Sequence, residues 1–183
     1  MKRFFDILLA LIALISLSPM FLIIFLLVRI DGAPVIFKQK RVGLKGEEFS
    51  IYKFRSMVVN AQMLGPYSTA ENDSRITPIG RWIRKTSIDE LPQLFNVLKG
   101  DMSVVGPRPN VPEQRDQYSV QDWNSRNSIL PGITGLAQAT KRSECGAEER
   151  LSLDLEYVKN QSLFFDVKII LMTVVQILHR GGN

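Results

Sequence analysis

The sequence has only one cysteine, Cys145, and one histidine, His179, in 183 residues. A single cysteine excludes a disulfide within the chain, and the two residues together cannot supply the ligands of a Cys/His zinc site. A metal ion bound here would therefore need oxygen ligands. Because Mg²⁺ is held by carboxylates and substrate phosphates, it is the metal that we expect.

Internal repeats and low-complexity segments are also missing.

The chain carries 23 Lys and Arg residues against 18 Asp and Glu residues, a net charge of +5. This excess favours anionic partners such as phosphates, lipid headgroups or nucleic acid, without choosing among them. The length suits one domain with a real core and is short for two.

A long apolar segment lies near the amino terminus. No charged residue occurs from Ile7 to Val28, and only Ser16, Ser18 and Pro19 interrupt the apolar side chains. These 22 residues could span a bilayer. A signal peptide is disfavoured, because the apolar run is long and no small-x-small cleavage site follows it.

The middle of this segment favours a re-entrant helix over a straight span. Pro19 removes a backbone donor and bends a helix, which leaves two halves of about 11 residues, or roughly 17 Å each. Each half reaches about halfway through a ~30 Å hydrocarbon layer. Basic residues flank both ends and give no sidedness: Lys2, Arg3, Arg29, Lys38, Lys40 and Arg41. A kinked spanning helix remains the alternative.

The rest of the chain predicts an α+β domain that is mostly helical. Segments 35–37 and 49–54 are typical of short strands, and the turn-rich segment 43–46 between them predicts a β-hairpin. Apolar spacing predicts helices around 79–83, 91–98, 148–159 and 163–178, with Lys99-Gly100 ending the second. The last helix fits either a core helix or a helix in the membrane interface. Segment 57–74 is predicted to be an irregular connection. We divide the chain into a membrane-anchoring segment, 1–31, and a catalytic domain, 32–183.

Two adjacent carboxylates, Asp89 and Glu90, are the strongest candidates for chemistry. Ser87 and Glu90 have the spacing of a capping box, so a purely structural role is an alternative. Pro92 would clash inside such a helix, which favours a start near Leu91 and leaves both carboxylates outside it. An aspartate can attack phosphorus directly, and a second carboxylate can hold a cation or accept a proton.

Basic side chains that could neutralise a phosphate accompany this pair. In Gly106-Pro107-Arg108-Pro109 two prolines stiffen the backbone around an arginine, whose planar fork suits phosphate oxygens. A surface turn with a solvated arginine is equally compatible. Lys53, Arg84 and Arg142 are further candidates, although each type is more often a solvated charge when taken singly.

The sequence resembles the bacterial sugar transferases of the monotopic phosphoglycosyl transferase superfamily over most of its length. The resemblance lies in Lys2–Ile7, Ser18-Pro19, Ile51–Met57, Asp89–Ser103, Gly106–Pro109, Pro131–Gln138 and Asp166–Ile169. The segments at Asp89 and Gly106 are the most specific.

The resemblance implies a chemistry for these residues. Asp89 would attack the sugar-proximal phosphate of a UDP-sugar, release UMP and retain the phosphosugar covalently. Glu90 would help to bind Mg²⁺, with Asp89 as the other metal ligand, or would assist deprotonation of the acceptor, polyprenyl (undecaprenyl) phosphate. Lys53, Arg84, Arg108 and Arg142 would surround the phosphates.

The resemblance also implies a place for the protein. It would be a re-entrant membrane protein at the cytoplasmic face of the bacterial inner membrane, with membrane lipids as partners and no nucleic acid. It would act in the first membrane step of a bacterial glycan pathway. The sequence leaves open whether it is a monomer or a homodimer.

Two departures from the family pattern affect the expected site. Ala139-Thr140-Lys141-Arg142 stands where the family often has Asn-Gly-Arg, so the alignment of Arg142 is open. Leu130 precedes Pro131, where a basic residue is common. The sugar therefore stays undetermined. Two other functions remain as alternatives: a Mg²⁺-dependent phosphodiesterase that transfers the group to water, and a non-catalytic scaffold that holds anionic lipid.

Overall fold

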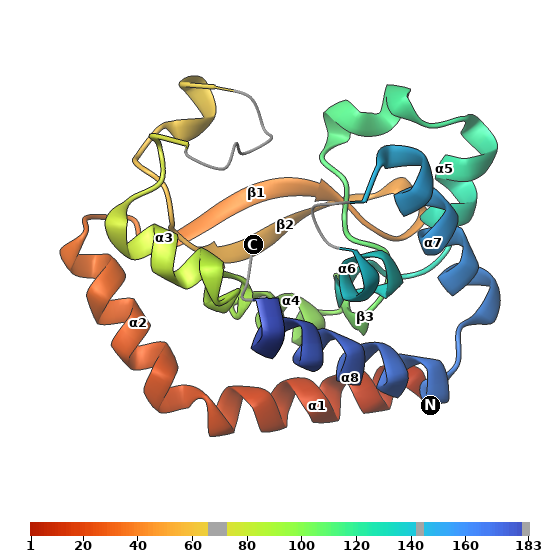
Figure 1. Ribbon diagram of the computed structural model, residues 1–183, viewed down its shortest axis with the longest axis horizontal. Coiled ribbons are helices and arrows are strands. Elements are labelled where there is room, and N and C mark those ends of the chain that lie inside the picture. The colour runs from red at the N-terminus through yellow and green to blue at the C-terminus, as the bar shows by residue number, and fades with distance from the viewer. Residues whose placement is uncertain (66–72, 142–144, 181–183) are drawn as a thin grey trace.

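The computed structural model describes residues 1–65, 73–141 and 145–180. The fold is mixed and mostly helical, with a hairpin across its centre and two long apolar helices along one side (Figure 1). Helices and strands occur in the order α1 (Lys2–Ser16), α2 (Ser18–Ile30), β1 (Ile36–Val42), β2 (Glu48–Phe54), α3 (Pro78–Lys85), α4 (Gln93–Lys99), β3 (Ser103–Val105), α5 (Val120–Arg126), β4 (Gly132–Thr134), α6 (Leu136–Thr140), α7 (Ala147–Asn160) and α8 (Leu163–Arg180). Short 3₁₀ turns are η1 (Leu44–Gly46), η2 (Ala61–Met63), η3 (Ile88–Glu90) and η4 (Pro112–Gln117).

The bend between α1 and α2 follows from Ser18-Pro19. Pro19 has no N–H to give to the carbonyl of Ile15, and the hydroxyl of Ser18 donates to that oxygen instead, at 2.8 Å. The chain bends by 66° between α1 and α2. Among the described residues, no single helix is long and apolar enough to cross a bilayer. The bent pair α1 and α2, taken together, has the required length and apolar composition.

The predicted hairpin is confirmed. Strands β1 and β2 are antiparallel, and Phe37 opposite Lys53 and Arg41 opposite Phe49 define their register. Strand β1 continues to Val42, well beyond the predicted segment 35–37. Because opposite residues point to one face of a hairpin, Gln39, Arg41 and Lys53 share a face.

A second, parallel pair of strands was not predicted. Strand β3 pairs with β4 in the register Ser103 to Gly132 and Val105 to Thr134. Each strand has only three residues, which is too short to show an alternating pattern in the sequence.

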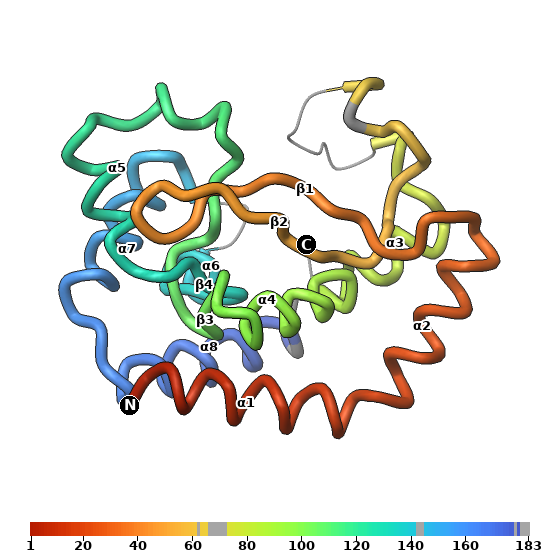
Figure 2. Tube along the Cα trace, turned by 180° about the vertical axis from the view of Figure 1, so that it is seen from behind, coloured from red at the N-terminus to blue at the C-terminus, as the bar shows by residue number. Residues whose placement is uncertain are grey.

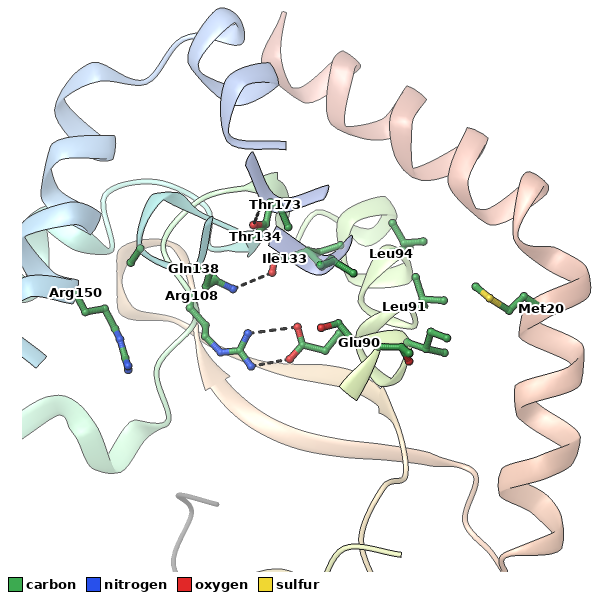
Figure 3. A pocket seen from close by; sticks show the side chains of 15 residues that line it. Met20, Glu90, Leu91, Leu94, Arg108, Ile133, Thr134, Gln138, Arg150 and Thr173 are labelled. Carbon is green, nitrogen blue, oxygen red and sulfur yellow. Dashed lines mark hydrogen bonds and ion pairs between the residues drawn. The ribbon is translucent and has the colours of Figure 1, made fainter. Parts of the chain in front are cut away.

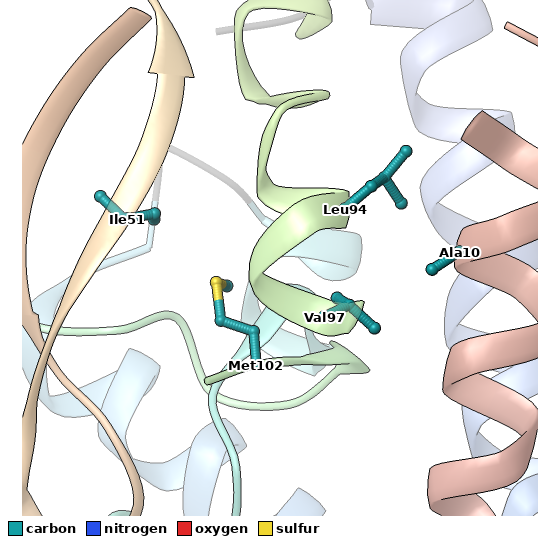
Figure 4. Close-up of a cluster of buried hydrophobic side chains, with 5 residues drawn as sticks. All are labelled: Ala10, Ile51, Leu94, Val97 and Met102. Atoms are coloured by element: carbon teal, nitrogen blue, oxygen red, sulfur yellow. The ribbon is translucent and has the colours of Figure 1, made fainter. Parts of the chain in front are cut away.

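The apolar helices share their cores with the rest of the protein. In one cluster Ala10 of α1 packs with Ile51, Leu94, Val97 and Met102 (Figure 4). Ile24 and Val28 of α2 are buried with Phe54 and Ile83 in a second cluster. A third cluster joins β3, α6, α7 and α8: Val105, Leu136, Ala139, Tyr157 and Ile169. The inward sides of α1 and α2 thus position α3, α4 and the hairpin.

Buried polar contacts hold the starts of α1 and α8 together. Lys2 donates to Asp166 at 2.7 Å, and the hydroxyl of Tyr157 donates to the same carboxylate at 2.6 Å. Asp6 accepts hydrogen bonds from the Ser103 hydroxyl and the Val104 N–H. Both views of the chain show α8 lying beside α1 (Figures 1 and 2). The outward sides of α1, α2 and α8 are apolar and exposed, including Leu8, Ile12, Ile15, Ile23, Phe164, Leu171 and Val174.

Candidate active site

Asp89 and Glu90 lie in the 3₁₀ turn η3, between α3 and α4. Ser87 has a left-handed backbone, with φ of 57°, and its side chain makes no cap hydrogen bond. The capping-box alternative is therefore wrong. Helix α4 begins at Gln93, two residues later than the predicted start at Leu91, and Pro92 precedes it. Both carboxylates lie outside the helix, as predicted.

Glu90 is held between two cations. Its Oε1 accepts hydrogen bonds from Lys53 Nζ at 2.7 Å and from Arg108 Nη2 at 2.6 Å. The second oxygen, Oε2, accepts from Arg108 Nη1 at 3.3 Å (Figure 3). The Glu90 side chain is only 12% exposed, so these charge-assisted bonds are shielded from water.

Asp89 is buried but unpaired. The residue is 7% exposed, and its carboxylate makes no hydrogen bond or ion pair with any residue in the described part of the chain. Burial raises the pKa of Asp89 to about 6, and the nearby charge of Glu90 adds to this, whereas Lys53 opposes it. A carboxylate in such a buried place is poorly solvated. Because it has no partner among the described residues, it is available to a ligand.

The two neighbouring carboxylates therefore differ in protonation behaviour. Burial alone would raise the pKa of Glu90, but the charges of Arg108 and Lys53 outweigh it and hold that pKa well below its usual range. Burial lowers the pKa of Lys53. Pairs of titratable groups whose environments separate their pKa values are typical of catalytic sites.

Arg108 stands on a turn whose backbone carbonyls are each hydrogen bonded. The oxygen of Pro107 accepts from the Gly132 N–H at 3.0 Å, that of Arg108 from the Arg126 guanidinium, and that of Pro109 from Arg41 at 3.0 Å. Gly132 permits the close approach, because a Cβ there would lie 2.1 Å from the Gly106 nitrogen. Arg108 is therefore fixed towards Glu90, and the alternative of a solvated surface turn is wrong.

The other predicted basic residues differ in placement. Arg84, on α3, is half-buried, and its charge lowers the pKa of Asp89, so it lies within electrostatic range of that carboxylate. Within the described ranges it forms no ion pair with a carboxylate. Arg142 lies outside the described residues. The structure thus brings Lys53, Arg84 and Arg108 to the two carboxylates.

A pocket of about 410 Å³ opens beside this cluster. Its polar side is formed by Glu90 and Arg108, and Arg150 lines it from α7 (Figure 3). The remaining wall is mainly apolar and includes Met20 of α2, Leu91 after η3, Leu94 of α4, Ala137 of α6 and Ile177 of α8. Asp89 itself does not line the pocket. The pocket thus has a mainly apolar wall and one charged end, formed by Glu90 and Arg108.

The site offers limited donors for a metal ion. In the described part of the chain no group of three His, Cys, Asp or Glu side chains could hold one. Two carboxylates remain, those of Asp89 and Glu90, and Asp89 has no other partner. Mg²⁺ usually binds one or two carboxylates and completes its shell with water and phosphate oxygens. The donor set thus fits Mg²⁺ that arrives with a phosphate substrate.

Comparison with known proteins shows which family the chain belongs to. The model of the family described as "Bacterial sugar transferase" matches residues 1–180. The chain belongs to this family. The resemblance predicted from the sequence is therefore confirmed.

Three relatives in this family are similar to the chain over nearly all of its length. An undecaprenyl-phosphate galactose phosphotransferase of Salmonella typhimurium is 44% identical over 100% of the chain and 41% of its own length. A UDP-glucose:undecaprenyl-phosphate glucose-1-phosphate transferase of Escherichia coli is 41% identical over 95% of the chain and 39% of its own length. The chain thus spans about two fifths of these relatives. An uncharacterized sugar transferase of Bacillus subtilis, EpsL, is 44% identical over 100% of the chain and 89% of its own length.

Sequence reasoning missed two arginines of this sugar transferase that hold the Arg108 turn. In the sequence Arg41 is only one of the basic residues that flank the membrane segment, and no pattern singles out Arg126. The alternation of Phe37, Gln39 and Arg41 could have placed Arg41 on the same face as Lys53, had β1 been predicted at its full length. For Arg126 no local pattern exists, because its partners Asp154 and Arg108 are distant in sequence.

Proposed function

We propose that this protein transfers a phosphosugar from a UDP-sugar to undecaprenyl phosphate through a covalent intermediate on Asp89, with release of UMP. The observation that carries the proposal is the contrast between the two carboxylates. Asp89 is buried and unpaired among the described residues, whereas Glu90 is neutralised by Lys53 and Arg108. The named activities of the Salmonella and E. coli relatives support the same substrate class.

The first step would be attack by an Asp89 oxygen on the phosphorus next to the sugar. A P–O bond forms, the bond to the second phosphate breaks, and UMP leaves with the bonding electrons. Lys53, Arg84 and Arg108 would balance the negative charge on the phosphate, since an anionic electrophile otherwise repels a carboxylate. Burial contributes here as well, because the Asp89 carboxylate has no hydrogen bond to a described residue that must break before it attacks.

The second step would return the carboxylate. An oxygen of the lipid phosphate attacks the phosphorus of the acyl-phosphate, and the bond to Asp89 breaks with both electrons remaining on Asp89. The product is a lipid-linked diphosphate sugar. Glu90 would position Lys53 and Arg108 and, with Asp89, would contribute carboxylate oxygens to Mg²⁺. When bound, Mg²⁺ would offset phosphate charge in both steps.

The pocket supports a lipid acceptor. An isoprenoid phosphate has a long apolar tail and a charged head, and the pocket has an apolar wall with Glu90 and Arg108 at one end. Met20 of α2 and Ile177 of α8 lie in that wall. The acceptor would therefore enter between the bent helix pair and α8.

The exposed apolar surfaces support a place in the membrane. We propose that α1 and α2 dip into the cytoplasmic leaflet of the inner membrane and return, and that the apolar outer side of α8 lies in the interface. Burying Phe164, Leu171 and Val174 in lipid removes apolar area from water. Arg29 and Lys168 are exposed at these helices and could reach lipid headgroups.

The test is to incubate the purified protein with a UDP-sugar and Mg²⁺ in the absence of acceptor. Intact-mass and peptide analysis should find one phosphosugar on Asp89 and an equal amount of UMP. Addition of undecaprenyl phosphate should discharge it. Asp89→Asn should lose both signals and at least about 1,000-fold of turnover, because Asn cannot form the acyl-phosphate.

Asp116→Asn, at an exposed aspartate, is the matched control and should behave as the wild type. Substantial turnover by Asp89→Asn would remove Asp89 as the nucleophile. Sugar phosphate formed equally well without the lipid acceptor would instead establish a phosphodiesterase. A panel of UDP-sugars in the same assay identifies the donor.

A further inference from the structure

The segment after the Arg108 turn carries a polar side chain with no partner. Asn110 is 5% exposed, and its side-chain amide makes no hydrogen bond with any described residue. The buried atom is the Nδ2 donor. A buried amide without a partner costs free energy, so such groups usually serve a ligand or another function.

Arg41 lies next to Asn110 and has a similar deficit. The Val42 N–H donates to the Asn110 carbonyl at 2.9 Å, which brings β1 against the segment that carries Asn110. Arg41 Nη1 donates to the Pro109 carbonyl and Nη2 donates to Gln39 Oε1 at 2.7 Å. Its Nε is buried without an acceptor among the described residues, and no described carboxylate pairs with its charge.

Two buried donors without a partner among the described residues, Asn110 Nδ2 and Arg41 Nε, therefore lie next to the Arg108 turn. The second of them belongs to a cation. Arg41 donates to the carbonyl of Pro109, the residue after Arg108, so the two arginines are neighbours. Burial, together with the charge of Arg108, lowers the pKa of Arg41 to about 10. Like charges held together in a partly buried place are stabilised when an anion lies between them. An anion with several acceptor oxygens would satisfy both donors and offset the two like charges.

The position relative to Asp89 indicates which anion this is. Lys53 and Arg108 both bind Glu90, the residue next to Asp89, whereas Arg41 binds the carbonyl of Pro109. Along the inner face of the hairpin Arg41 lies four residues from Phe37, the residue opposite Lys53. Arg41 therefore contacts the Arg108 turn at Pro109, further along the hairpin than the residue opposite Lys53, which binds Glu90.

We infer that Arg41 and Asn110 bind the nucleoside-linked phosphate of the donor, the phosphate that leaves as part of UMP. This inference rests on the proposed function, because it assigns the far end of the same diphosphate. Arg108 would lie between the two phosphates, with Lys53 and Arg84 on the sugar side. The pair would contribute mainly to nucleotide affinity and to the stability of the departing phosphate.

The test compares two variants, Arg41→Met and Asn110→Leu, with the wild type. Binding of UDP, UMP and uridine in the presence of Mg²⁺ would be measured by calorimetry or by competition against UDP-sugar turnover. Each variant should bind UDP and UMP about tenfold more weakly, the effect of one hydrogen bond to a charged group. Uridine, which has no phosphate, should bind as it does to the wild type.

Stability measurements separate a ligand role from a structural one. Asn110→Leu removes a buried amide that has no partner, so the ligand-free variant should unfold at the wild-type temperature or above it. A structural role would lower affinity and unfolding temperature together. Arg41→Lys keeps the charge without the planar fork, and should recover part of the UDP affinity lost in Arg41→Met.

Arg81→Met and Asn124→Leu make the same chemical changes at exposed positions and are the controls. UDP affinity within twofold of wild type in both site variants would overturn the inference while leaving the proposed function intact. Equal weakening of uridine and UMP would also overturn it, because it would place the pair at the nucleoside. A wild-type protein that binds no UDP would overturn both proposals.

Discussion

Arg126 donates a hydrogen bond from its guanidinium to the backbone carbonyl oxygen of Arg108. Arg126 is 2% exposed, its Nε donates to Asp154 at 2.8 Å, and its guanidinium lies over the ring of Tyr118. One buried arginine thus joins α5 and α7 to the turn that carries Arg108. The orientation of Arg108 towards Glu90 depends on a contact made behind the site.

This contact gives the first prediction. Arg126→Met leaves Asp154 buried without its partner, and breaking a buried ion pair costs about 3–5 kcal/mol, so thermal or denaturant unfolding should show a loss of that size. Arg126→Lys should destabilise less, yet should slow UMP release, because one ammonium cannot reproduce the planar fork that holds both partners. Arg81→Met is the control at an exposed arginine, with an expected loss below about 1 kcal/mol. Wild-type turnover in Arg126→Lys would contradict this positioning role.

Asp89 should reduce the stability of the ligand-free protein above pH 6. Its pKa rises from 3.8 to about 6 on folding, so the folded state holds its proton more tightly and stability falls as the pH rises through this range. The shift corresponds to at most about 3 kcal/mol. Asp89→Asn should therefore unfold at a higher temperature than wild type at pH 7.5, with a smaller difference at pH 4. A difference that does not change with pH would contradict the assignment.

Gly132 should tolerate no side chain. An added Cβ would lie 2.1 Å from the backbone nitrogen of Gly106, which follows β3, and 2.3 Å from the backbone oxygen of Thr134 in β4. Gly132→Ala should therefore cost about 1–3 kcal/mol or more and lower the rate of UMP release, since the Arg108 turn must shift. Gly146→Ala meets no atom within 4 Å and should be close to neutral in both measurements. Similar unfolding temperatures for the two variants would contradict the close packing of this turn.

The topology of the bent helix pair can be tested by labelling. In a Cys145→Ser background, one cysteine is added ahead of Met1 and another replaces Glu47, which is exposed after η1 and has an ordinary extended backbone. A re-entrant pair predicts that an impermeant maleimide labels both sites from the same side of sealed membrane vesicles. Labelling from opposite sides would establish a spanning helix.

Much of this protein could be predicted from its sequence, because the relevant signals are local. The bend at Ser18-Pro19, the hairpin and the helix ending at Gly100 depend on proline, glycine and apolar spacing within a few residues. The carboxylate pair and Arg108 were found for the same reason, and the resemblance to the family assigned their roles. The β3–β4 pair was missed because three residues carry no periodicity.

Only the tertiary structure decided how Asp89 and Glu90 differ. In the sequence they are adjacent acids with the same capping alternative, whereas in the fold Lys53 and Arg108 bind Glu90 and leave Asp89 buried and unpaired among the described residues. The distant contacts of Arg41, Asn110 and Arg126 appear only there as well. The physical reason is that charge, burial and hydrogen bonding depend on which segments meet in space. The sequence by itself determined the residue types available for the chemistry, and the fold determined their surroundings.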